Sequence, residues 1–366
     1  MGLSVDITKT LGAFTLNMEF SSRGGRLGIL GASGCGKSMT LKCIAGIEKP
    51  DRGRIVLDDR VLFDSSQKVN IKPQQRNVGY MFQNYALFPT MTVSQNVASG
   101  LGRPGPDTYA RVEEMLSKFK LDGLAGRYPD ELSGGQQQRV AMARIMAYEP
   151  DIILLDEPFS ALDVFLKDQM ERELEEMLDD YDGMMIMVSH SRDEIFRFCD
   201  DAIVLKDGSV SVHKETSSLF EDPATKEASI LTGCKNYSDI QVIDEHTFRC
   251  IDWGGEIIHV SRSIPPYADC IGYRAHYFEP VWGEREENCI KVTLKRVSDL
   301  PFEREYYFRP QEMTEMTDPG EDGGMDDQNN STIAWFVQQK AAEELKEKGV
   351  PDHLKLREDK ILFLKK

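Results

Sequence analysis

Three short apolar runs in the first half of the chain predict strands that are buried on both faces. They span residues 26–30, 152–155 and 184–188, and a segment with apolar residues at helical spacing follows the first of them. Runs of this kind are typical of strands in the parallel sheet of an α/β protein. We therefore predict that the chain begins with an α/β domain.

Alternating patterns and turn residues predict the other elements of this first part. Residues 5–20 alternate apolar and polar side chains in places and predict edge strands, and apolar residues at 55–57 and 61–63 predict a hairpin. A further strand is predicted to end on Gln83. Residues 93–127 are predicted to be helical, and a Gly-Gly turn after Leu132 is predicted to open another helix.

The pattern changes beyond about residue 233. Short apolar segments separated by turns predict a small β-barrel with one amphipathic helix near 341–348, and the acidic, glycine-rich residues 312–327 predict a mobile loop. The predicted domains are therefore 1–232, α/β, and 233–366, a β-barrel. The barrel strands are predicted at 239–242, 256–260, 270–277, 289–297, 305–309, 332–337 and 360–364.

Composition narrows the class of protein. The chain has 366 residues, 40% of them hydrophobic, and a formal net charge of −17, which disfavours a nucleic-acid partner and direct adhesion to anionic lipid. We find no apolar run near the ~20 residues of a spanning helix and no pattern of a signal peptide. Seven cysteines without a C-x-x-C pair predict reduced thiols. The expected location is cytosolic, or peripheral on the cytosolic side of a membrane.

The segment after the first apolar run carries a phosphate-binding pattern. It reads Gly31-Ala32-Ser33-Gly34-Cys35-Gly36-Lys37-Ser38, which has the G-x-x-x-x-G-K-[ST] spacing between a predicted strand and helix. Glycines let backbone amides close around a triphosphate, and the helix N-terminus adds its positive end. Lys37 is predicted to reach the β- and γ-phosphates and Ser38 to ligate Mg²⁺. A chance glycine cluster in a turn is the alternative.

Polar side chains follow the other two apolar runs. Asp156 and Glu157 end the second run, and His190 follows the third. Because the carboxyl ends of parallel strands meet at the edge where ligands bind, we expect these side chains beside the nucleotide. Asp156 is predicted to hold Mg²⁺, directly or through water, and Glu157 to orient and partly deprotonate the attacking water. A structural histidine is the alternative for His190.

Two further segments are candidates for contact with nucleotide. The predicted helix after Leu132 begins with Ser133, Gly134, Gly135 and Gln136, and its free amides form an anion site. An ordinary capped helix is the alternative. Phe14 is the candidate for stacking on adenine, with a core phenylalanine as the alternative.

Taken in order along the chain, these segments resemble the ATP-binding subunits of ABC transporters. The resemblance covers residues 1 to about 232 and implies a P-loop NTPase fold, with a RecA-like core and a helical subdomain, that hydrolyses ATP with Mg²⁺. Met39 departs from the family, which usually has a hydroxyl residue there; its backbone amide remains available to the nucleotide. The matching motifs are the phosphate loop at Gly31–Ser38, the glutamine loop at Gln83, the signature Leu132-Ser133-Gly134-Gly135-Gln136, the carboxylates ending on Glu157, the D-loop Ser160-Ala161-Leu162-Asp163 and the switch His190.

The resemblance also implies roles and partners. Gln83 contacts Mg²⁺ and water, and His190 contacts the γ-phosphate. A second copy of the chain supplies Ser133 and Gly134 to the γ-phosphate held at Lys37, so that each copy has half of each site. The segment after Gln83 implies transmembrane permease subunits as partners, with a solute-binding protein acting through them, and hence a peripheral position on the cytoplasmic face of the cell membrane.

Segments at 9–14, at 54–57 with 61–63, and at 231–236 are most similar to the molybdate importer subunit, with sulfate and other oxyanion importers close behind. The C-terminal part is similar to the regulatory (TOBE/MOP-like) barrel of such subunits. Within it, Arg274 and His276 are expected either to form a salt-bridged strand surface or to meet an oxyanion. Importers of iron, polyamines or sugars, a soluble ABC ATPase without a transport role, and an oxyanion sensor with a vestigial ATPase are the alternative functions.

Overall fold

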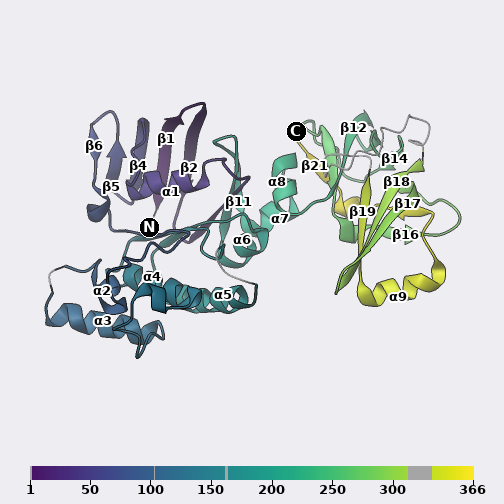
Figure 1. Ribbon diagram of the computed structural model, residues 1–366. Helices are drawn as coiled ribbons and strands as arrows, with labels where there is room; N and C mark the ends of the chain where they lie inside the picture. The colour runs from purple at the N-terminus through teal and green to yellow at the C-terminus, as the bar shows by residue number, and fades with distance from the viewer. Residues whose placement is uncertain (1, 103, 161–163, 312–331) are drawn as a thin grey trace. The chain divides into compact units, whose positions relative to one another are not determined.

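The computed structural model describes residues 2–102, 104–160, 164–311 and 332–366, and the chain divides into two compact units, Met1–Ser217 and Ser218–Lys366 (Figure 1). Asp163 and the loop predicted at 312–327 lie outside the described residues. The sequence-based domain boundary after residue 232 follows helix α8 (Lys226–Leu231), whereas the division into compact units falls within α7 (Thr216–Glu221).

A mixed sheet of eleven strands, counted over the described residues, organises the first unit. Its order is β6-β5-β4-β1-β2-β11-β10-β3-β9-β8-β7, and the run from β10 to β7 is parallel. The strands are β1 (Leu3–Leu11), β2 (Phe14–Ser22), β3 (Arg26–Gly31), β4 (Arg52–Leu57), β5 (Arg60–Asp64), β6 (Val69–Asn70), β7 (Val78–Met81), β8 (Ile152–Asp156), β9 (Met184–Val188), β10 (Asp201–Lys206) and β11 (Ser209–Glu215).

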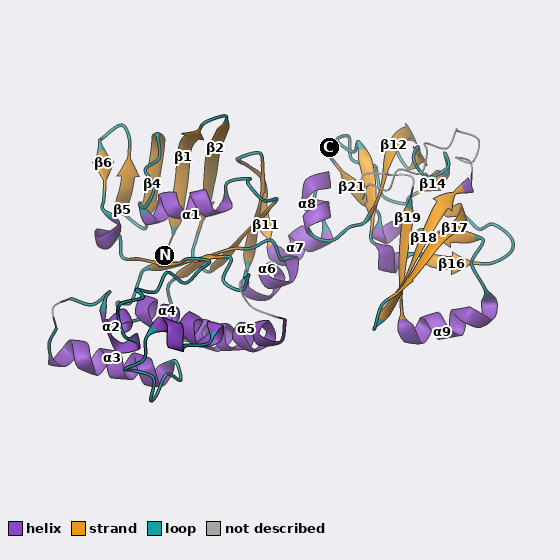
Figure 2. Cartoon of the chain, in the orientation of Figure 1, coloured by secondary structure: helices purple, strands orange, loops and turns teal. Residues whose placement is uncertain are grey.

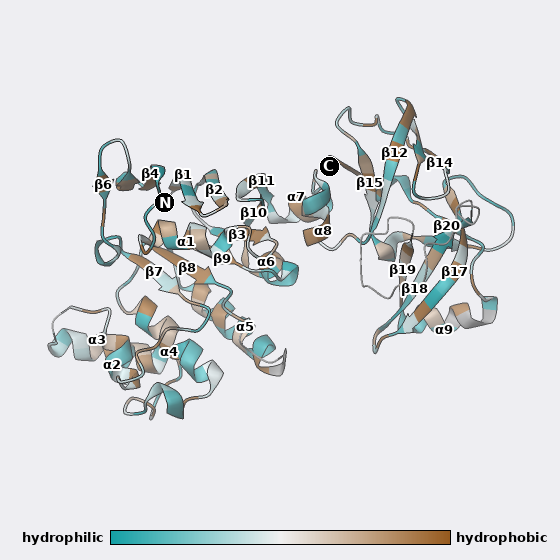
Figure 3. Ribbon diagram, turned by 45° about the horizontal axis from the view of Figure 1, so that its top comes forward, coloured by the Kyte–Doolittle hydropathy of each residue, from teal (hydrophilic) through white to brown (hydrophobic). Residues whose placement is uncertain are grey.

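The three apolar runs become adjacent strands at the centre of this sheet, β3, β9 and β8, which confirms the predicted α/β class. Every residue of β8 and β9 is buried, because helices or loops cover both faces of the parallel region. Figure 3 shows the hydrophobic colour on β7 and β8 in this region. Val188 lies opposite both Ile29 and Asp156, so the carboxyl ends of the three strands lie at one edge.

Two expectations for the first unit are wrong in detail. The strands at 5–20, β1 and β2, are not at an edge, because the β4–β5 hairpin extends the sheet beyond β1 and β11 follows β2. The strand predicted to end on Gln83 ends earlier, at Met81, and Gln83 is the second residue of the loop after it. The hairpin itself is confirmed, with Leu57 opposite Arg60.

The region predicted as helical at 93–127 contains two helices, α2 and α3, and irregular chain. Gly100, Gly102 and Gly105 separate them, because glycine disfavours a continuous helix. Pro106 begins α3, because proline is favoured in the first turn of a helix. In Figure 2 these helices lie with α4 and α5 on one side of the sheet. The helices of this unit are α1 (Lys37–Ala45), α2 (Val93–Ala98), α3 (Pro106–Lys118), α4 (Gly134–Met146), α5 (Val164–Asp179) and α6 (Arg192–Phe198).

The second unit is built from two five-stranded sheets and the helix α9 (Gln339–Lys348), which confirms a β-rich, barrel-like domain. Each of the seven predicted strands overlaps an observed one, whereas the short strands β13, β16 and β20 were not predicted. The strands are β12 (Asn236–Asp244), β13 (Thr247–Cys250), β14 (Ile257–His259), β15 (Cys270–Tyr273) and β21 (Leu362–Leu364) in one sheet, and β16 (Glu279–Val281), β17 (Cys289–Asp299), β18 (Glu303–Pro310), β19 (Ile333–Gln338) and β20 (His353–Lys355) in the other.

A buried asparagine links the two sheets of this unit. The Asn236 side chain donates hydrogen bonds to the carbonyls of Tyr273 (3.0 Å) and Ala334 (2.9 Å), and its oxygen accepts from the Ala334 amide (2.7 Å). Aromatic side chains, among them Trp253, Tyr273 and Trp335, fill the core beside it. A satisfied polar group inside an apolar core fixes the relation between the strands that share it.

Among the described helices, none combines the length and the apolar composition needed to cross a membrane.

Candidate functional site

The phosphate loop connects β3 to α1. Gly34 and Gly36 have φ angles of 80° and 106°, which side chains rarely tolerate, so the loop curls only because these positions are glycine. The Lys37 ammonium is buried inside this curl and donates hydrogen bonds to the carbonyls of Gly31 (2.8 Å) and Ala32 (3.0 Å). The loop therefore holds a positive charge at its centre, within reach of a bound phosphate.

The other predicted residues of the loop differ in exposure. Ser33 and Gly34 are exposed, whereas Cys35 is buried beneath the loop, and burial raises the pKa of its thiol. Met39 packs against the core of the first unit, so its side chain points away from a nucleotide on the loop. Cys35 and Met39 can therefore serve a nucleotide only through their backbone.

Phe14 lies beside the first turn of α1. A Cβ atom added at Gly36 would approach the Phe14 Cζ atom to 3.2 Å, and one at Gly208 would approach it to 3.1 Å. The ring is partly buried against the same core. Phe14 is thus close to the phosphate loop, and its stacking on adenine stays a prediction.

Asp156 joins the loop to the end of β8. Its Oδ1 atom accepts a hydrogen bond from the Ser38 hydroxyl (2.7 Å), and its Oδ2 atom accepts one from the Tyr80 hydroxyl (2.8 Å). A hydroxyl and a carboxylate are the oxygen ligands that Mg²⁺ prefers. The donor set formed by Ser38 and Asp156 therefore fits Mg²⁺.

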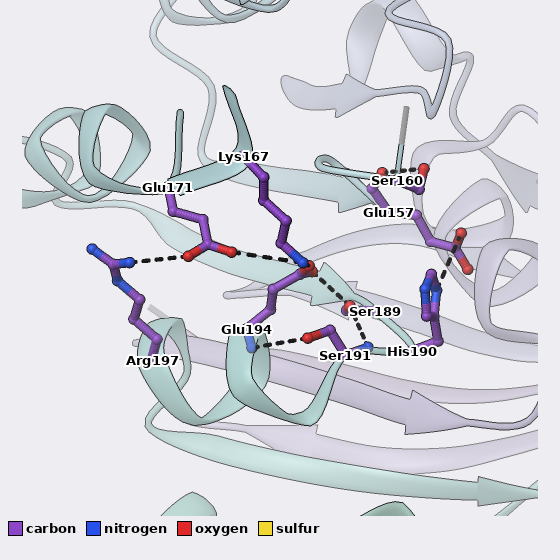
Figure 4. A network of polar contacts seen from close by, with 9 residues as sticks. All are labelled: Glu157, Ser160, Lys167, Glu171, Ser189, His190, Ser191, Glu194 and Arg197. Carbon is purple, nitrogen blue, oxygen red and sulfur yellow. Dashed lines mark hydrogen bonds and ion pairs between the residues drawn. The ribbon is translucent and has the colours of Figure 1, made fainter. Parts of the chain in front are cut away.

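Glu157, Gln83 and His190 lie close together beside Asp156, at the carboxyl ends of the central strands. The Glu157 Oε2 atom is 3.5 Å from the Gln83 amide nitrogen. The same oxygen is 3.6 Å from the His190 Nδ1 atom, and Figure 4 shows these two side chains facing each other. Gln83 thus lies with Glu157, and no hydrogen bond joins it to Ser38 or Asp156 in the described part of the chain. The imidazole is 64% exposed and the carboxylate 23%, so both are open to a substrate.

The backbone of Glu157 is held in an unusual conformation. Its φ angle is 49°, its amide donates to the Val188 carbonyl (3.0 Å), and its carbonyl accepts from the Ser160 hydroxyl (3.0 Å). A non-glycine residue in the left-handed region is strained, and such strain is often found at functional sites. Anchors on both sides of the residue aim the Glu157 side chain away from the buried end of β8.

The signature segment forms the N-terminus of α4. The Ser133 hydroxyl accepts a hydrogen bond from the Gln136 amide (3.3 Å), while the Gln136 side chain accepts one from the Ser133 amide (3.0 Å). Ser133 and Gly134 are exposed and Gly135 is buried. By helix geometry the first amides of α4 point outward from its end. Within the described residues, no hydrogen bond or ion pair links this helix end to the phosphate loop of the same chain.

The segment after Gln83 is a rigid, partly exposed surface. Tyr85 and Ala86 adopt left-handed φ angles of 59° and 43°, and the Arg144 guanidinium donates to both carbonyls, at 2.8 and 2.9 Å. The side chain of Asn96 donates to the carbonyls of Phe88 (3.2 Å) and Met91 (3.0 Å), yet Phe88 remains 46% exposed. These anchors hold Phe88 at the surface.

Arg274 in the second unit has partners other than those expected. Its guanidinium donates to the carbonyls of Thr232 (2.7 Å) and Phe220, and within the described ranges of the chain no salt bridge of Arg274 is found. His276 lies edge-on to the Phe336 ring at 5.5 Å. Arg274 therefore ties the chain near α7 and α8 to β15, because carbonyls at helix ends need donors.

Sequence reasoning missed Tyr80. It lies opposite Leu154 in the parallel register of β7 and β8, and Asp156, two residues further, shares the face of Leu154. Burial, followed by the neighbouring Asp156 charge, raises the pKa of Tyr80, so its hydroxyl stays protonated and donates. The sequence offered one sign of this role: Tyr80 lies near the end of an apolar strand, and a buried tyrosine hydroxyl needs a hydrogen-bond partner.

Replacing Tyr80 with phenylalanine is expected to lower the free energy of unfolding by about 1.5–3 kcal/mol, the range for a hydrogen bond to a charged group. The loss arises because one oxygen of the buried Asp156 carboxylate is left without its donor. Urea denaturation monitored by circular dichroism measures it. The matched control is Tyr109→Phe, at a side chain that is 64% exposed. Equal stability of the two variants would contradict a structural role for the Tyr80 hydroxyl.

Comparisons with known proteins agree on one family. A family model described as ABC transporter matches residues 15–160. The sulfate/thiosulfate import ATP-binding protein CysA of Synechocystis sp. is 37% identical over 304 residues, which cover 81% of this chain and 81% of that protein. The Fe(3+) ions import ATP-binding protein FbpC of Haemophilus influenzae is 39% identical over 238 residues, covering 64% and 67%. The molybdenum import ATP-binding protein ModC of Rhodospirillum rubrum is 37% identical over 222 residues, covering 60% of each.

A solved structure is similar as well. It is the dimeric post-hydrolysis state of the ATP-binding cassette MJ0796 bound to ADP and Pi, with a TM-score of 0.50 and 31% sequence identity. The match covers 59% of this chain and 99% of that one.

Proposed function

The chain belongs to the import ATP-binding subunits of the ABC transporter family, and from this membership we propose that it powers the uptake of a tetrahedral oxyanion, molybdate or a relative such as sulfate. As a member of this family it hydrolyses ATP coupled to transport. The main support for an oxyanion as the solute is the match to a sulfate/thiosulfate import protein. This match spans 304 residues and therefore includes part of the second unit. The matches to molybdenum import proteins support the same chemical class.

The geometry supports a division of roles within one active site. Lys37 and the amides of the phosphate loop bind the phosphates, and Ser38 with Asp156 would hold Mg²⁺, which neutralises phosphate charge when it is bound. Glu157 accepts a proton from the attacking water, and the Gln83 amide and the His190 imidazole beside it orient that water and the γ-phosphate. Tyr80 keeps Asp156 facing Ser38.

A second copy of the chain completes each site in this proposal. The exposed Ser133 and Gly134 at the end of α4 would meet the γ-phosphate bound at Lys37 of the other copy, because the outward amides of a helix N-terminus attract anions. The dimeric state of the similar ATP-binding cassette supports this arrangement. Asp163 is proposed to line the same interface, on the resemblance alone.

The segment after Gln83 is the proposed contact for the permease subunits. Its exposed Phe88, held by Arg144 and Asn96, offers a rigid apolar anchor of the kind that dominates binding energy at protein interfaces. This contact would hold the chain peripherally on the cytoplasmic face of the membrane, and a solute-binding protein would act on it only through the permease.

The test is to look for a permease and a solute receptor in the neighbouring reading frames and to reconstitute the chain with them. We expect the three proteins to co-purify from detergent-extracted membranes. Loaded receptor should stimulate ATP hydrolysis with molybdate, tungstate or sulfate and leave it unstimulated with ferric ion. A complex carrying Glu157→Gln controls for contaminating ATPases. Stimulation by ferric ion alone would assign the chain to the iron importers instead, and absence of any membrane partner would favour a soluble ABC ATPase.

A further inference from the structure

A buried carboxylate connects two helices to the loop that carries His190. Glu194, on α6, is 6% exposed. Its Oε2 atom accepts a hydrogen bond from the Ser189 hydroxyl (2.6 Å), and its Oε1 atom accepts one from the Lys167 ammonium on α5 (2.5 Å), as Figure 4 shows. The three side chains therefore form a continuous line from α5 to the residue directly before His190.

Both residues next to His190 are held by this arrangement. The Ser189 hydroxyl also accepts a hydrogen bond from the Ser191 amide (2.9 Å), and the Ser191 hydroxyl accepts one from the Glu194 amide (3.4 Å), which caps α6. His190 lies between them with its side chain 64% exposed. Because little packing surrounds the imidazole, the fixed backbone on either side determines where it points.

Lys167 compensates the negative charge of the buried Glu194 side chain. A carboxylate as buried as Glu194 is costly unless a cation and hydrogen bonds compensate it. Burial, the largest single influence, lowers the pKa of Lys167, but the hydrogen bond to Glu194 and the negative charges of Glu194, Glu171 and Asp193 together outweigh it and raise the pKa overall, so the ammonium stays charged. Glu171 lies 3.8 Å from the same ammonium and is paired with Arg197 at 3.0 Å, which leaves Lys167 available to Glu194.

We propose that Lys167, Glu194 and Ser189 are positioning residues that fix His190 against Glu157 for ATP hydrolysis. They touch neither substrate nor metal and act through the backbone of the 189–191 loop. The inference rests on the proposed role of His190 in the hydrolytic site.

The experiment compares variants in the assembled importer. Lys167→Met is expected to lower kcat about tenfold and to change the KM for ATP less than twofold, because the line acts on hydrolysis and not on nucleotide binding. Lys167→Arg restores a cation and should stay within about threefold of the parental kcat. The matched control is Lys118→Met, which breaks an exposed ion pair with Asp180 (3.2 Å) just beyond the C-terminal end of α5 and should leave kcat unchanged.

A double-mutant cycle separates positioning from a general structural effect. If Lys167 acts through His190, adding Lys167→Met to His190→Ala should cause no further loss of kcat. A further tenfold loss in that background would overturn the inference. Because Lys167→Met leaves Glu194 unpaired and can unfold the chain, Ser189→Ala, which removes only a hydroxyl, is measured beside it. A parental kcat in folded Ser189→Ala and Lys167→Met would also overturn the inference.

The cycle also separates the proposed role of His190 in hydrolysis from the positioning role of Lys167, Glu194 and Ser189. If His190→Ala alone hydrolyses ATP at the parental rate, the proposed role of His190 fails, and the positioning role fails with it. If His190→Ala is impaired while the Lys167 and Ser189 variants are not, the role of His190 stands and the positioning line alone is overturned.

Discussion

Replacing Glu157 with glutamine is expected to lower the rate of ATP hydrolysis by about 10² to 10⁴-fold, the usual contribution of a positioned general base. Glutamine keeps the shape of the side chain and a hydrogen bond to its neighbours, but its amide cannot accept a proton from water. Lys37 and the phosphate loop are unchanged, so ATP still binds. Phosphate release in the steady state and equilibrium binding of labelled ATP measure the two effects separately.

The same variant should accumulate as a dimer when ATP is present, because nucleotide that is not hydrolysed continues to hold two copies together. Size-exclusion chromatography with and without ATP tests this. Glu176→Gln is the matched control, since this glutamate forms an exposed ion pair with Lys120 and no other polar contact with the residues that the structure describes. Hydrolysis by Glu157→Gln at the parental rate would show that another group, or none, serves as the base.

Replacing Ser133 with a bulky residue such as tyrosine is expected to reduce hydrolysis by about 10²-fold or more, the cost of removing a donor aimed at developing negative charge. The exposed tip of α4 would no longer fit against a phosphate bound by the other copy. Binding of ATP to a single chain should persist, because among the described residues no hydrogen bond joins Ser133 to the phosphate loop of its own chain. The measurement is the rate of hydrolysis against protein concentration.

For the parental protein we expect the rate per chain to fall on dilution, since each site needs two copies. Ser133→Thr keeps a hydroxyl at the cap of α4 and serves as the conservative control, and thermal unfolding shows whether the tyrosine variant is folded. A rate that is first-order in protein at high dilution, together with an active Ser133→Tyr variant, would rule out a shared site.

Much of the site could be predicted because its determinants are short and local. The phosphate loop follows from eight consecutive residues and their flanks, and Gly34 and Gly36 do adopt the left-handed angles that such a curl requires. The buried strands were predicted from apolar runs, and Asp156, Glu157 and His190 from their position just after those runs. The parallel order of the strands then brought these side chains to one edge.

Local patterns predicted the structure less well where glycines interrupt a helical region and where strands from distant parts of the sequence pair. The helical region at 93–127 was predicted as continuous, because periodicity over α2 and α3 outweighed the glycines between them. The strands at 5–20 were placed at an edge, because nothing in their own residues indicates that β4 and β11 lie on either side of them.

By itself, the sequence determined the family of the protein, the phosphate loop and the polar residues that end the buried strands, since each depends on neighbours within a few positions. Only the tertiary structure decided how those residues are held. Tyr80 supports Asp156 across 76 positions, and Lys167 supports Glu194 across 27. Such contacts depend on the register of separate strands and helices, which packing of the whole domain sets and no local pattern encodes.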